Sequence, residues 1–471
     1  MFIASVALLF VLLVGRTRRD PLNKFPGPFI ARWTTLYRGY YDLVKKGGWL
    51  KHLEVLHRMY GPIVRVGPNE LHFNDPRAYG EIYSLGSCFH KDPVLYGSFG
   101  NTVDSVFTTP DPQDAAVFRN ILAPYLSRRA VIKREHIIRD KVEKLISSLE
   151  SYGPETGSPA NLDHAIPSTA LDILTELMFT RSFNMLSVPE FNHLFVRREE
   201  PALLNIWLTK YLPDSTTPVF GALTRLVLAH GPFKGVVQAQ IKLIREELDR
   251  TLEDFDLIQE QIINRENSKA TLGRLNTLLR PRRLISEIIN LRFAGTDTIS
   301  NACLVALRYV LTRREVLKRL LQELDDAWTK NSDSDMTYEQ LEKLPYLTAV
   351  IKESLRLSHG VVSPKGRIVG PGDAILLGET IPAGTVIGIS SIFVHWNPRL
   401  FPEPKKFDPQ RWLNTKPNVD PEVNSEKYLV NFSRGPRSCI GFNLAWCELY
   451  LLLGYLFRKL EFVLPEEYDP E

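Results

Sequence analysis

The feature that most constrains this chain of 471 residues is a short loop near its C-terminal end that contains a single cysteine. The loop reads Phe432-Ser433-Arg434-Gly435-Pro436-Arg437-Ser438-Cys439-Ile440-Gly441, and an apolar helical run follows it. Backbone N–H groups and the positive end of a helix stabilise a cysteine at this position as a thiolate. Gly435 and Gly441 let the backbone bend tightly and let a flat ligand lie against it. Cys439 is therefore predicted to bind a soft metal centre, and a thiolate in this setting suits the axial position of a haem iron.

The loop resembles the haem-binding loop of the cytochrome P-450 family, which is written Phe-x-x-Gly-x-Arg-x-Cys-x-Gly. The Ala and Glu that usually follow in that family fall at Ala445 and Glu448. Most free cysteines are small buried residues, which is the alternative for Cys439. Five specified positions at a background of roughly 5–7% each match by chance in about one of several thousand chains of this length. The haem interpretation is therefore preferred, and the resemblance places these loop residues around the cofactor: Phe432, Gly435, Arg437 and Gly441.

The overall composition indicates a large folded protein and gives no support for a nucleic-acid partner. Apolar residues make up 44% of the chain and aromatic residues 10%, which is enough for a sizeable core. The 58 basic and 54 acidic residues leave a net charge of only +4, so no broad basic surface is expected. The cysteines show no paired spacing, which argues against a disulfide framework or a zinc site and favours a reducing compartment. They are Cys88, Cys303, Cys439 and Cys447.

The N-terminal end predicts an uncleaved membrane anchor, either complete or the last part of a longer one. Residues 2–15 form an unbroken run of small and apolar residues, and Arg16, Arg18 and Arg19 follow it at once. The run is shorter than the roughly 20 residues of a full span, and its length also fits a signal-peptide core. A signal peptide carries its charge before the run, whereas positive charge after it keeps the downstream chain in the cytosol. The expected division is an anchor with its basic flank over residues 1–19, a stiff, non-helical Pro-rich hinge over 20–30, and one catalytic domain over 31–471.

Segments after the hinge are predicted from their local patterns. Residues 63–73 alternate like a β-hairpin with a turn at the middle. Residues 97–110 form a loop that, by resemblance, covers the haem and helps to select substrate, with Phe99 and Phe107 as substrate contacts. An ordinary surface loop is an equal alternative for this stretch. Residues 130–280 carry helical patterns and no chemical motif, and we expect them to form scaffold and the access route for substrate.

A long helix is predicted over residues 282–313, and its middle reads Ala294-Gly295-Thr296-Asp297-Thr298. Glycine inside a helix costs about 1 kcal/mol relative to alanine, so Gly295 asks for a reason, such as a groove where the helix passes a ligand. The segment matches the family's pattern Ala/Gly-Gly-x-Asp/Glu-Thr, which implies that Ala294 and Gly295 lie beside the haem. By the same resemblance, Asp297 and Thr298 relay the protons that cleavage of dioxygen requires. Ser and Thr often bond back to the backbone inside helices, so the segment alone is a weak signal. It gains weight because it precedes the cysteine loop by the separation that the family requires.

A charged network is predicted beneath the cofactor. Glu353 and Arg356 lie three residues apart on a predicted helix over 346–357 and can pair. An exposed ion pair worth under about 1 kcal/mol is the simpler alternative. In the family, Glu-x-x-Arg joins an Arg from a later Phe-x-Pro-x-Arg segment, which is Arg411 here. The resemblance gives these three residues a structural role, because a buried network of this kind would lock the loop that holds Cys439.

The resemblance also implies three arginines that bind the haem propionates, namely Arg119, Arg367 and Arg437. Arg119 lies on a helix predicted over residues 111–129, with Asp111 as its cap. Relatives often carry Trp or His four residues before this arginine, where this chain has Ala115. The segment that contains Arg367 should run beside the haem, which makes Val361 and Val362 candidate substrate contacts.

Taken together, the motifs imply a mainly α fold with a small β region, the cytochrome P-450 fold, and a non-covalent haem b whose iron is bound by Cys439. The implied reaction is NADPH-driven monooxygenation of an apolar small molecule by hydroxylation or epoxidation. Electrons would come from a separate NADPH–cytochrome P-450 reductase, with cytochrome b5 as a further donor, because the chain has no flavin or Rossmann pattern. The implied location is the endoplasmic reticulum membrane, with the catalytic domain in the cytosol. The sequence is similar to filamentous-fungal members that oxidise secondary metabolites, including trichodiene-oxygenase-like enzymes, which favours a terpenoid or polyketide-derived substrate.

Two alternatives stay open at the level of sequence. A haem-thiolate isomerase or dehydratase would rearrange an already oxidised substrate without a reductase. A haem sensor would bind the cofactor without turnover. Neither alternative needs an acid and a hydroxyl on the oxygen-activating helix, and both Asp297 and Thr298 are present.

Overall fold

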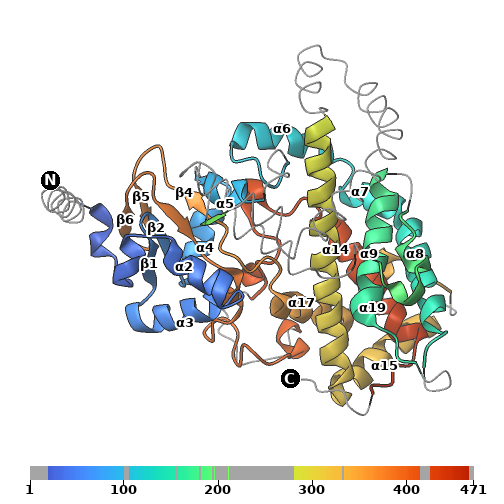
Figure 1. The fold of residues 1–471 in the computed structure, drawn as a ribbon. Helices are drawn as coiled ribbons and strands as arrows, with labels where there is room; N and C mark the ends of the chain where they lie inside the picture. The colour runs from blue at the N-terminus through green and yellow to red at the C-terminus, as the bar shows by residue number, and fades with distance from the viewer. Residues whose placement is uncertain are drawn as a thin grey trace, which may run out of the picture.

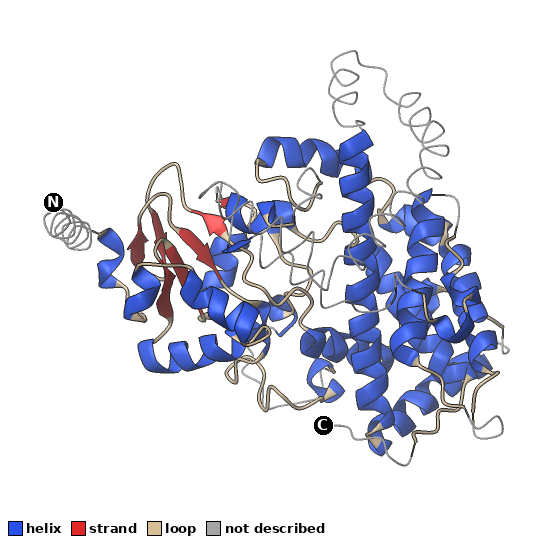
Figure 2. Ribbon diagram, in the orientation of Figure 1, coloured by secondary structure: helices blue, strands red, loops and turns tan. Residues whose placement is uncertain are grey.

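The computed structural model describes residues 20–87, 89–99, 105–153, 158–179, 182–193, 196, 210–211, 281–330, 334–413 and 425–465. Figure 1 shows them as a β-containing region near the N-terminal end and a larger helical region. Figure 2 shows that the strands gather in the first of these regions, whereas helices form almost all of the second. The predicted mainly α fold with a small β region is confirmed.

The long helix α14, Pro281–Leu311, runs through the helical region (Figure 1) and packs against α9, α17 and α19. These partners are Leu162–Phe179, Pro345–Ser358 and Phe442–Lys459. Their apolar side chains form the main hydrophobic core together with α8, Glu135–Leu149, and α15, Arg314–Lys330. A Cβ atom on Gly295 would lie 3.0 Å from Cδ2 of Leu174 on α9. Gly295 therefore has a packing reason of its own, because it lets two core helices approach closely.

Shorter helices complete the described part of the chain. The α-helices are α2 (Leu36–Gly39), α3 (Trp49–Tyr60), α4 (Pro76–Tyr83), α5 (Pro93–Gly97), α6 (Pro112–Leu122), α7 (Arg128–Lys133), α16 (Tyr338–Leu341) and α18 (Ser391–His395). The 3₁₀-helices are η1 (Pro21–Lys24), η2 (Phe29–Arg32), η5 (Met185–Ser187), η6 (Pro189–Phe191), η7 (Pro409–Trp412), η8 (Ser425–Tyr428) and η9 (Gly435–Arg437), and η3 (Tyr40–Val44) is a π-helix.

The larger sheet has the strand order β1-β2-β7-β4-β3. Its strands are β1 (Ile63–Gly67), β2 (Glu70–Phe73), β7 (Val386–Gly388), β4 (Arg367–Ile368) and β3 (His90–Lys91). Strand β2 pairs parallel with β7, and the other pairs are antiparallel. A second sheet is the hairpin of β5, Ala374–Leu376, and β6, Glu379–Ile381. The hairpin predicted over residues 63–73 is present as β1 and β2, and the larger sheet joins segments from both ends of the chain.

Two local predictions differ from the structure. The single helix predicted over residues 111–129 is wrong, because α6 ends at Leu122 and α7 begins only at Arg128. Pro124 lies in the break, where it lacks the N–H that a continuous helix would need. The cap itself is confirmed, since Asp111 accepts hydrogen bonds from the first turn of α6.

The segment expected to be a non-helical hinge, residues 20–30, contains η1 and part of η2 and packs against the sheet. Leu22 and Phe25 are buried in the core of the β region. The backbone N–H of Arg65 donates to the carbonyl of Pro26 at 2.8 Å. This segment is therefore a fixed part of the β region. The anchor predicted over residues 1–19 lies outside the described residues.

Candidate active site

The cysteine loop is held in a single shape by its backbone. Gly435 has a φ of +67°, and a Cβ atom there would lie 2.4 Å from the carbonyl oxygen of Tyr83, so only glycine fits. The N–H of Cys439 donates to the carbonyl of Phe432 at 2.7 Å, which closes the loop. The Phe432 ring packs edge-on against Phe442 of α19, with 4.9 Å between ring centroids. The loop is thereby fixed between the end of α4 and the start of α19.

The Cys439 side chain is accessible at the N-terminal end of α19. Displacement of water by the surrounding protein raises the pKa of its thiol. The N–H of Gly441, which bonds to the sulfur, acts in the opposite direction on this pKa, as do the nearby charges of Arg119 and Lys365. The stabilisation of the thiolate that the sequence predicts is therefore present, but desolvation outweighs it. A cation at the sulfur would add the missing stabilisation of the charged form.

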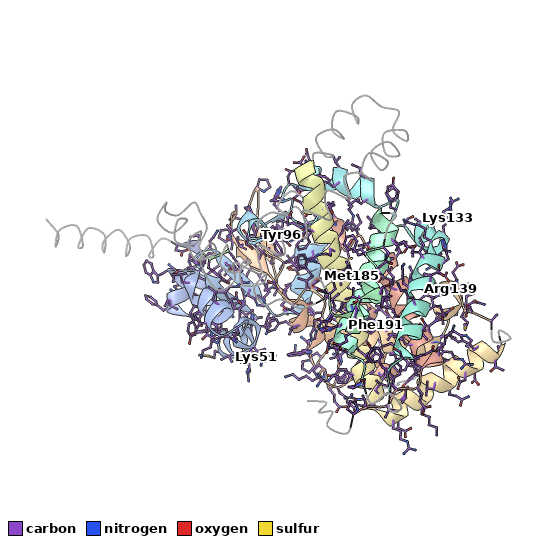
Figure 3. All side chains as sticks on the ribbon, turned by 45° about the vertical axis from the view of Figure 1, so that its right-hand side comes forward. Lys51, Tyr96, Lys133, Arg139, Met185 and Phe191 are labelled. Atoms are coloured by element: carbon purple, nitrogen blue, oxygen red, sulfur yellow. The ribbon has the colours of Figure 1, made fainter. Side chains whose placement is uncertain are left out.

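Five basic side chains, called the basic cluster below, lie close enough to act on one another's charge, and two of them, Arg119 and Lys365, also act on Cys439. They are Lys91, Arg119, Lys365, Arg367 and Arg437. Arg119 reaches from α6 to the carbonyl of Ser438 at 2.7 Å, directly beside the cysteine. Arg437 donates to three successive carbonyls, those of Thr109, Pro110 and Asp111, at 2.9–3.1 Å. Arg367 donates to the hydroxyl of Tyr96 at 3.2 Å, and Figure 3 shows Tyr96 on the side of the β region that faces α14.

Within the described ranges of the chain, no carboxylate forms an ion pair with any member of the basic cluster, and the carboxylate of Asp111 acts on Arg437 only through its charge. Lys91 and Arg367 are both buried and lie directly opposite each other in the β3–β4 register. Like charges in that position destabilise a sheet. Burial, followed by the neighbouring Arg437 and Arg367, holds the pKa of Lys91 well below its usual range. Burial, followed by Arg367, lowers the pKa of Arg437 to about 10.

Buried cations without a counter-charge fit an anionic ligand. Two carboxylates, as on a haem, would offset part of the positive charge of the cluster, and the accessible sulfur of Cys439 would be available to the metal. Lys91 belongs to this group, although no motif in the sequence marks it. Only the pairing of β3 with β4 brings it opposite Arg367, so sequence reasoning missed it.

On α14, the residues of the predicted proton relay are accessible. Ala294, Asp297 and Thr298 are all exposed. The hydroxyl of Thr298 donates to the carbonyl of Ala294 at 2.6 Å, a bond that fixes its orientation within the helix. The helix that carries this group, α14, packs against α19, the helix that directly follows the cysteine loop. The proton-relay role stays a prediction.

The charged network predicted beneath the loop is assembled in the structure. The buried carboxylate of Glu353 accepts two hydrogen bonds from Arg356, at 2.8 and 2.9 Å, and one from Arg411 at 2.9 Å. It also accepts the N–H of Asp408 at 2.8 Å and the indole N–H of Trp412 at 2.9 Å. Such complete hydrogen bonding is what makes a buried charge tolerable. The network ties α17 to η7.

The candidate substrate contacts fall into two groups. Phe107 packs edge-on against Phe99, at 5.3 Å between centroids, and against Tyr96 at 5.5 Å. Val361 is exposed, and the carbonyl of Val362 accepts the Ser390 hydroxyl at 2.6 Å. Residues 100–104 of the predicted covering loop lie outside the described residues. The carbonyl of Phe107 accepts a hydrogen bond from the ammonium of Lys91. The three rings of Tyr96, Phe99 and Phe107, called the aromatic group below, therefore adjoin the basic cluster.

The family model of cytochrome P450 matches residues 32–471 of the chain. The chain is 30% identical over 457 residues to the cytochrome P450 monooxygenase TRI4 of Fusarium sporotrichioides, covering 94% of this chain and 84% of that protein. It is 33% identical to the tryptophan 6-hydroxylase fscE of Fusarium equiseti, with 98% of this chain and 90% of that protein covered. It is also 33% identical to the conidiogenone synthase PchP450 of Penicillium rubens, with coverage of 96% and 89%. The chain belongs to the cytochrome P450 family and is a P450 monooxygenase, a family whose cofactor is a haem bound through a cysteine thiolate.

Proposed function

We propose that this monooxygenase binds haem b through Cys439 and the basic cluster, and inserts one oxygen atom into an apolar secondary metabolite. The observation that carries the proposal is the basic cluster beside the accessible thiol of Cys439, because its members Lys91 and Arg367 are buried and no carboxylate among the described residues forms an ion pair with either of them. A haem in this position would supply the activation of dioxygen.

The protein's own residues would orient the cofactor and move protons. Arg119 and Arg437 are fixed by backbone carbonyls, so their charges are oriented before a ligand binds. The Thr298 hydroxyl, bonded to the Ala294 carbonyl, can pass a proton while Asp297 replaces it from the solvent side. The Glu353 network keeps the cysteine loop in place without taking part in turnover.

Electrons for the reaction would come from NADPH through a separate flavoprotein reductase, with cytochrome b5 as a second donor. The chain carries no flavin or dinucleotide fingerprint of its own. A docked reductase would approach from the side of the cysteine loop, where Arg434 and Arg437 lie.

The substrate that we propose is a terpenoid or polyketide-derived compound. The aromatic group of Tyr96, Phe99 and Phe107 supports an apolar substrate. Relatives at similar identity include one named for an aromatic amino acid, tryptophan, and one named for conidiogenone. Tryptophan therefore belongs in the panel of test compounds.

We also propose that the N-terminal side of the β region rests on a membrane, that of the endoplasmic reticulum. Residues of η2, α2 and η3 form an exposed apolar stripe at helical spacing, which consists of Phe29, Trp33, Leu36, Tyr40 and Val44. Phe29 is 73% and Val44 is 66% exposed, and the apolar run of residues 2–15 lies N-terminal to the stripe, separated from it by residues 16–28. Within the described ranges, no helix has the length and apolar character needed to cross a bilayer. Flotation with phosphatidylcholine vesicles tests the proposal: Phe29→Ser with Val44→Ser should weaken binding, and equal flotation would refute a role for the stripe.

An optical titration tests the proposed chemistry. The purified ferric protein should show a haem spectrum. After reduction, carbon monoxide should give a difference band typical of thiolate ligation, and this band should disappear in Cys439→Ser. Terpenoids, polyketides and tryptophan are then added in turn, and a low- to high-spin shift identifies the class that binds. Product formation that requires NADPH and reductase supports a monooxygenase, whereas conversion without them supports an isomerase or dehydratase. A well-folded protein without haem would refute the proposal.

A further inference from the structure

Two buried polar side chains on α14 lie outside the motif that identifies this helix. Glu287 and Asn290 are each only 9% exposed. Glu287 precedes Thr298 by three helical turns, so at about 100° per residue both lie on nearly the same face of α14. The rise of an α-helix separates them by roughly 16 Å. Asn290 precedes Asp297 by seven residues, so it lies on nearly the same face as Asp297. A carboxyl and an amide thus extend the two directions in which the residues of the predicted proton relay lie.

Both side chains bind the segment that follows the undescribed part of the covering loop. The Glu287 carboxylate accepts the backbone N–H of Val106 at 2.8 Å. The Asn290 amide donates to the Ser105 hydroxyl at 2.8 Å, and also to the carbonyl of Ser286 at 2.9 Å, which orients it. Two adjacent residues of the loop are therefore attached to α14 by two separate hydrogen bonds.

The attached segment, Ser105–Thr109, is stiffened by its own hydrogen bonds. The hydroxyls of Ser105 and Thr108 lie 2.9 Å apart and bond to each other. The carbonyl of Ser105 accepts the backbone N–H of Thr109 at 2.9 Å and its hydroxyl at 2.6 Å. All three of these residues are buried. Attachment at Ser105 and Val106 therefore also fixes Phe107, whose ring belongs to the aromatic group.

We propose that Glu287 and Asn290 are positioning residues for substrate selectivity, which attach Ser105–Thr109 to α14 and so hold Phe107 as a fixed apolar wall of the substrate site. This inference rests on the proposed function, because it assigns the wall to the substrate site of the proposed monooxygenase. The ligand class that such a wall selects is apolar and large enough to reach it. A small polar ligand at the metal would not sense it.

The chemistry of Glu287 supplies a conservative variant. Burial raises its pKa to about 7, opposed by the Val106 N–H and by Arg283. The role in attachment needs only an acceptor for the Val106 N–H, which the amide oxygen of Glu287→Gln retains. Glu287→Ala removes the acceptor and leaves the Val106 N–H without that partner. Glu287→Gln should therefore keep Ser105–Thr109 attached to α14, and Glu287→Ala should weaken this attachment.

The test compares two probes in the purified holoenzyme. Imidazole reports on the metal position alone, whereas 1-tritylimidazole is bulky enough to contact the wall, and both give optical shifts on binding. In Glu287→Ala and Asn290→Ala, the dissociation constant of 1-tritylimidazole should rise about two- to tenfold, the range expected for a lost aromatic contact. The dissociation constant of imidazole should stay unchanged. In Glu287→Gln, the ratio of the two dissociation constants should equal that of wild type. Ser300→Ala is the matched control, because it removes a buried hydrogen bond of α14, to the carbonyl of Thr296, away from the loop.

Hydrogen–deuterium exchange gives a readout that needs no haem. Peptides that contain Val106 should exchange faster in Glu287→Ala than in wild type and Glu287→Gln. Faster exchange with an unchanged ratio of the two dissociation constants would refute the selectivity role, and unchanged exchange would refute the attachment itself. If wild type binds no haem, the proposed function fails, while the exchange experiment still decides whether Glu287 holds the loop.

Discussion

Replacement of Lys91 by methionine should have opposite effects on the stability of the haem-free protein and on the retention of haem. Lys91 is buried opposite Arg367, and its ammonium donates to the carbonyl of Phe107. Without an anion, the charge costs several kcal/mol of desolvation, and its bond to the carbonyl offsets about 1.5–3 kcal/mol of that. Lys91→Met should therefore stabilise the haem-free protein by about 1 kcal/mol, which raises its Tm by roughly 1–2 °C.

In the haem-bound protein, Lys91→Met should be destabilising instead, because it should weaken the binding of haem. A charge-assisted hydrogen bond to a carboxylate is worth about 1.5–3 kcal/mol, so its loss should speed haem dissociation roughly ten- to hundredfold. Transfer of haem to excess apomyoglobin, followed in the visible spectrum, measures this rate. Lys141→Met is the control, because Lys141 pairs with Glu176 on the helical side. It should leave haem loss unchanged and should not stabilise the haem-free protein.

The pH dependence of the haem-free protein provides an independent check. The folded-state pKa of Lys91 lies well below its usual value because of burial. The unfolded chain thus binds more protons between the two pKa values, and stability should rise with pH across that window. Lys91→Met should remove the contribution of Lys91 to this rise of stability with pH. A haem-free variant that is less stable than wild type, together with unchanged haem loss, would refute the assignment of Lys91 to the basic cluster.

Three further outcomes are expected. Thr298→Ala should keep the haem spectrum but separate NADPH consumption from product formation, as measured by the ratio of the two rates, and unchanged coupling would argue against the relay. Glu353→Gln should destabilise the protein by about 3–5 kcal/mol, because it leaves buried arginines uncompensated, and chemical denaturation measures this; a loss below about 1 kcal/mol would indicate an exposed pair. Gly435→Ala should prevent correct folding of the cysteine loop, since its Cβ would lie 2.4 Å from the carbonyl oxygen of Tyr83; loss of the haem spectrum measures this, and a normal spectrum would contradict it.

The sequence predicted those parts of the site that residue type and spacing specify within one segment. The cysteine loop, the Glu353 network and the hairpin of β1 and β2 all follow local patterns, and the structure assembles each of them. Gly435 was predicted to allow a tight bend, and its positive φ confirms this. The capping role of Asp111 was equally local. Such features are predictable because their geometry depends on few neighbours.

Features that depend on distant neighbours were missed or misjudged. Gly295 is predicted to border a ligand, which stays a prediction, and the structure adds a packing contact with Leu174 of α9 that no local pattern identifies. The Pro-rich segment of residues 20–30 was expected to be a hinge, because the sequence does not show that Leu22 and Phe25 have a core to enter. The place of Lys91 in the basic cluster can be recognised only from the pairing of β3 with β4. In each case the sequence shows the type of residue, but its neighbours come from distant segments that only the fold brings together.

Lys91 also joins the cofactor side of the site to the substrate side. Its ammonium belongs to the basic cluster and holds the carbonyl of Phe107, while Glu287 holds the neighbouring Val106. Lys91→Met should thus change both the rate of haem loss and the preference for 1-tritylimidazole over imidazole. Glu287→Ala should change only the preference, because Glu287 contacts the loop and lies outside the basic cluster. If both variants changed haem loss equally, the wall would be a part of cofactor binding, and the separation of the two roles would fail.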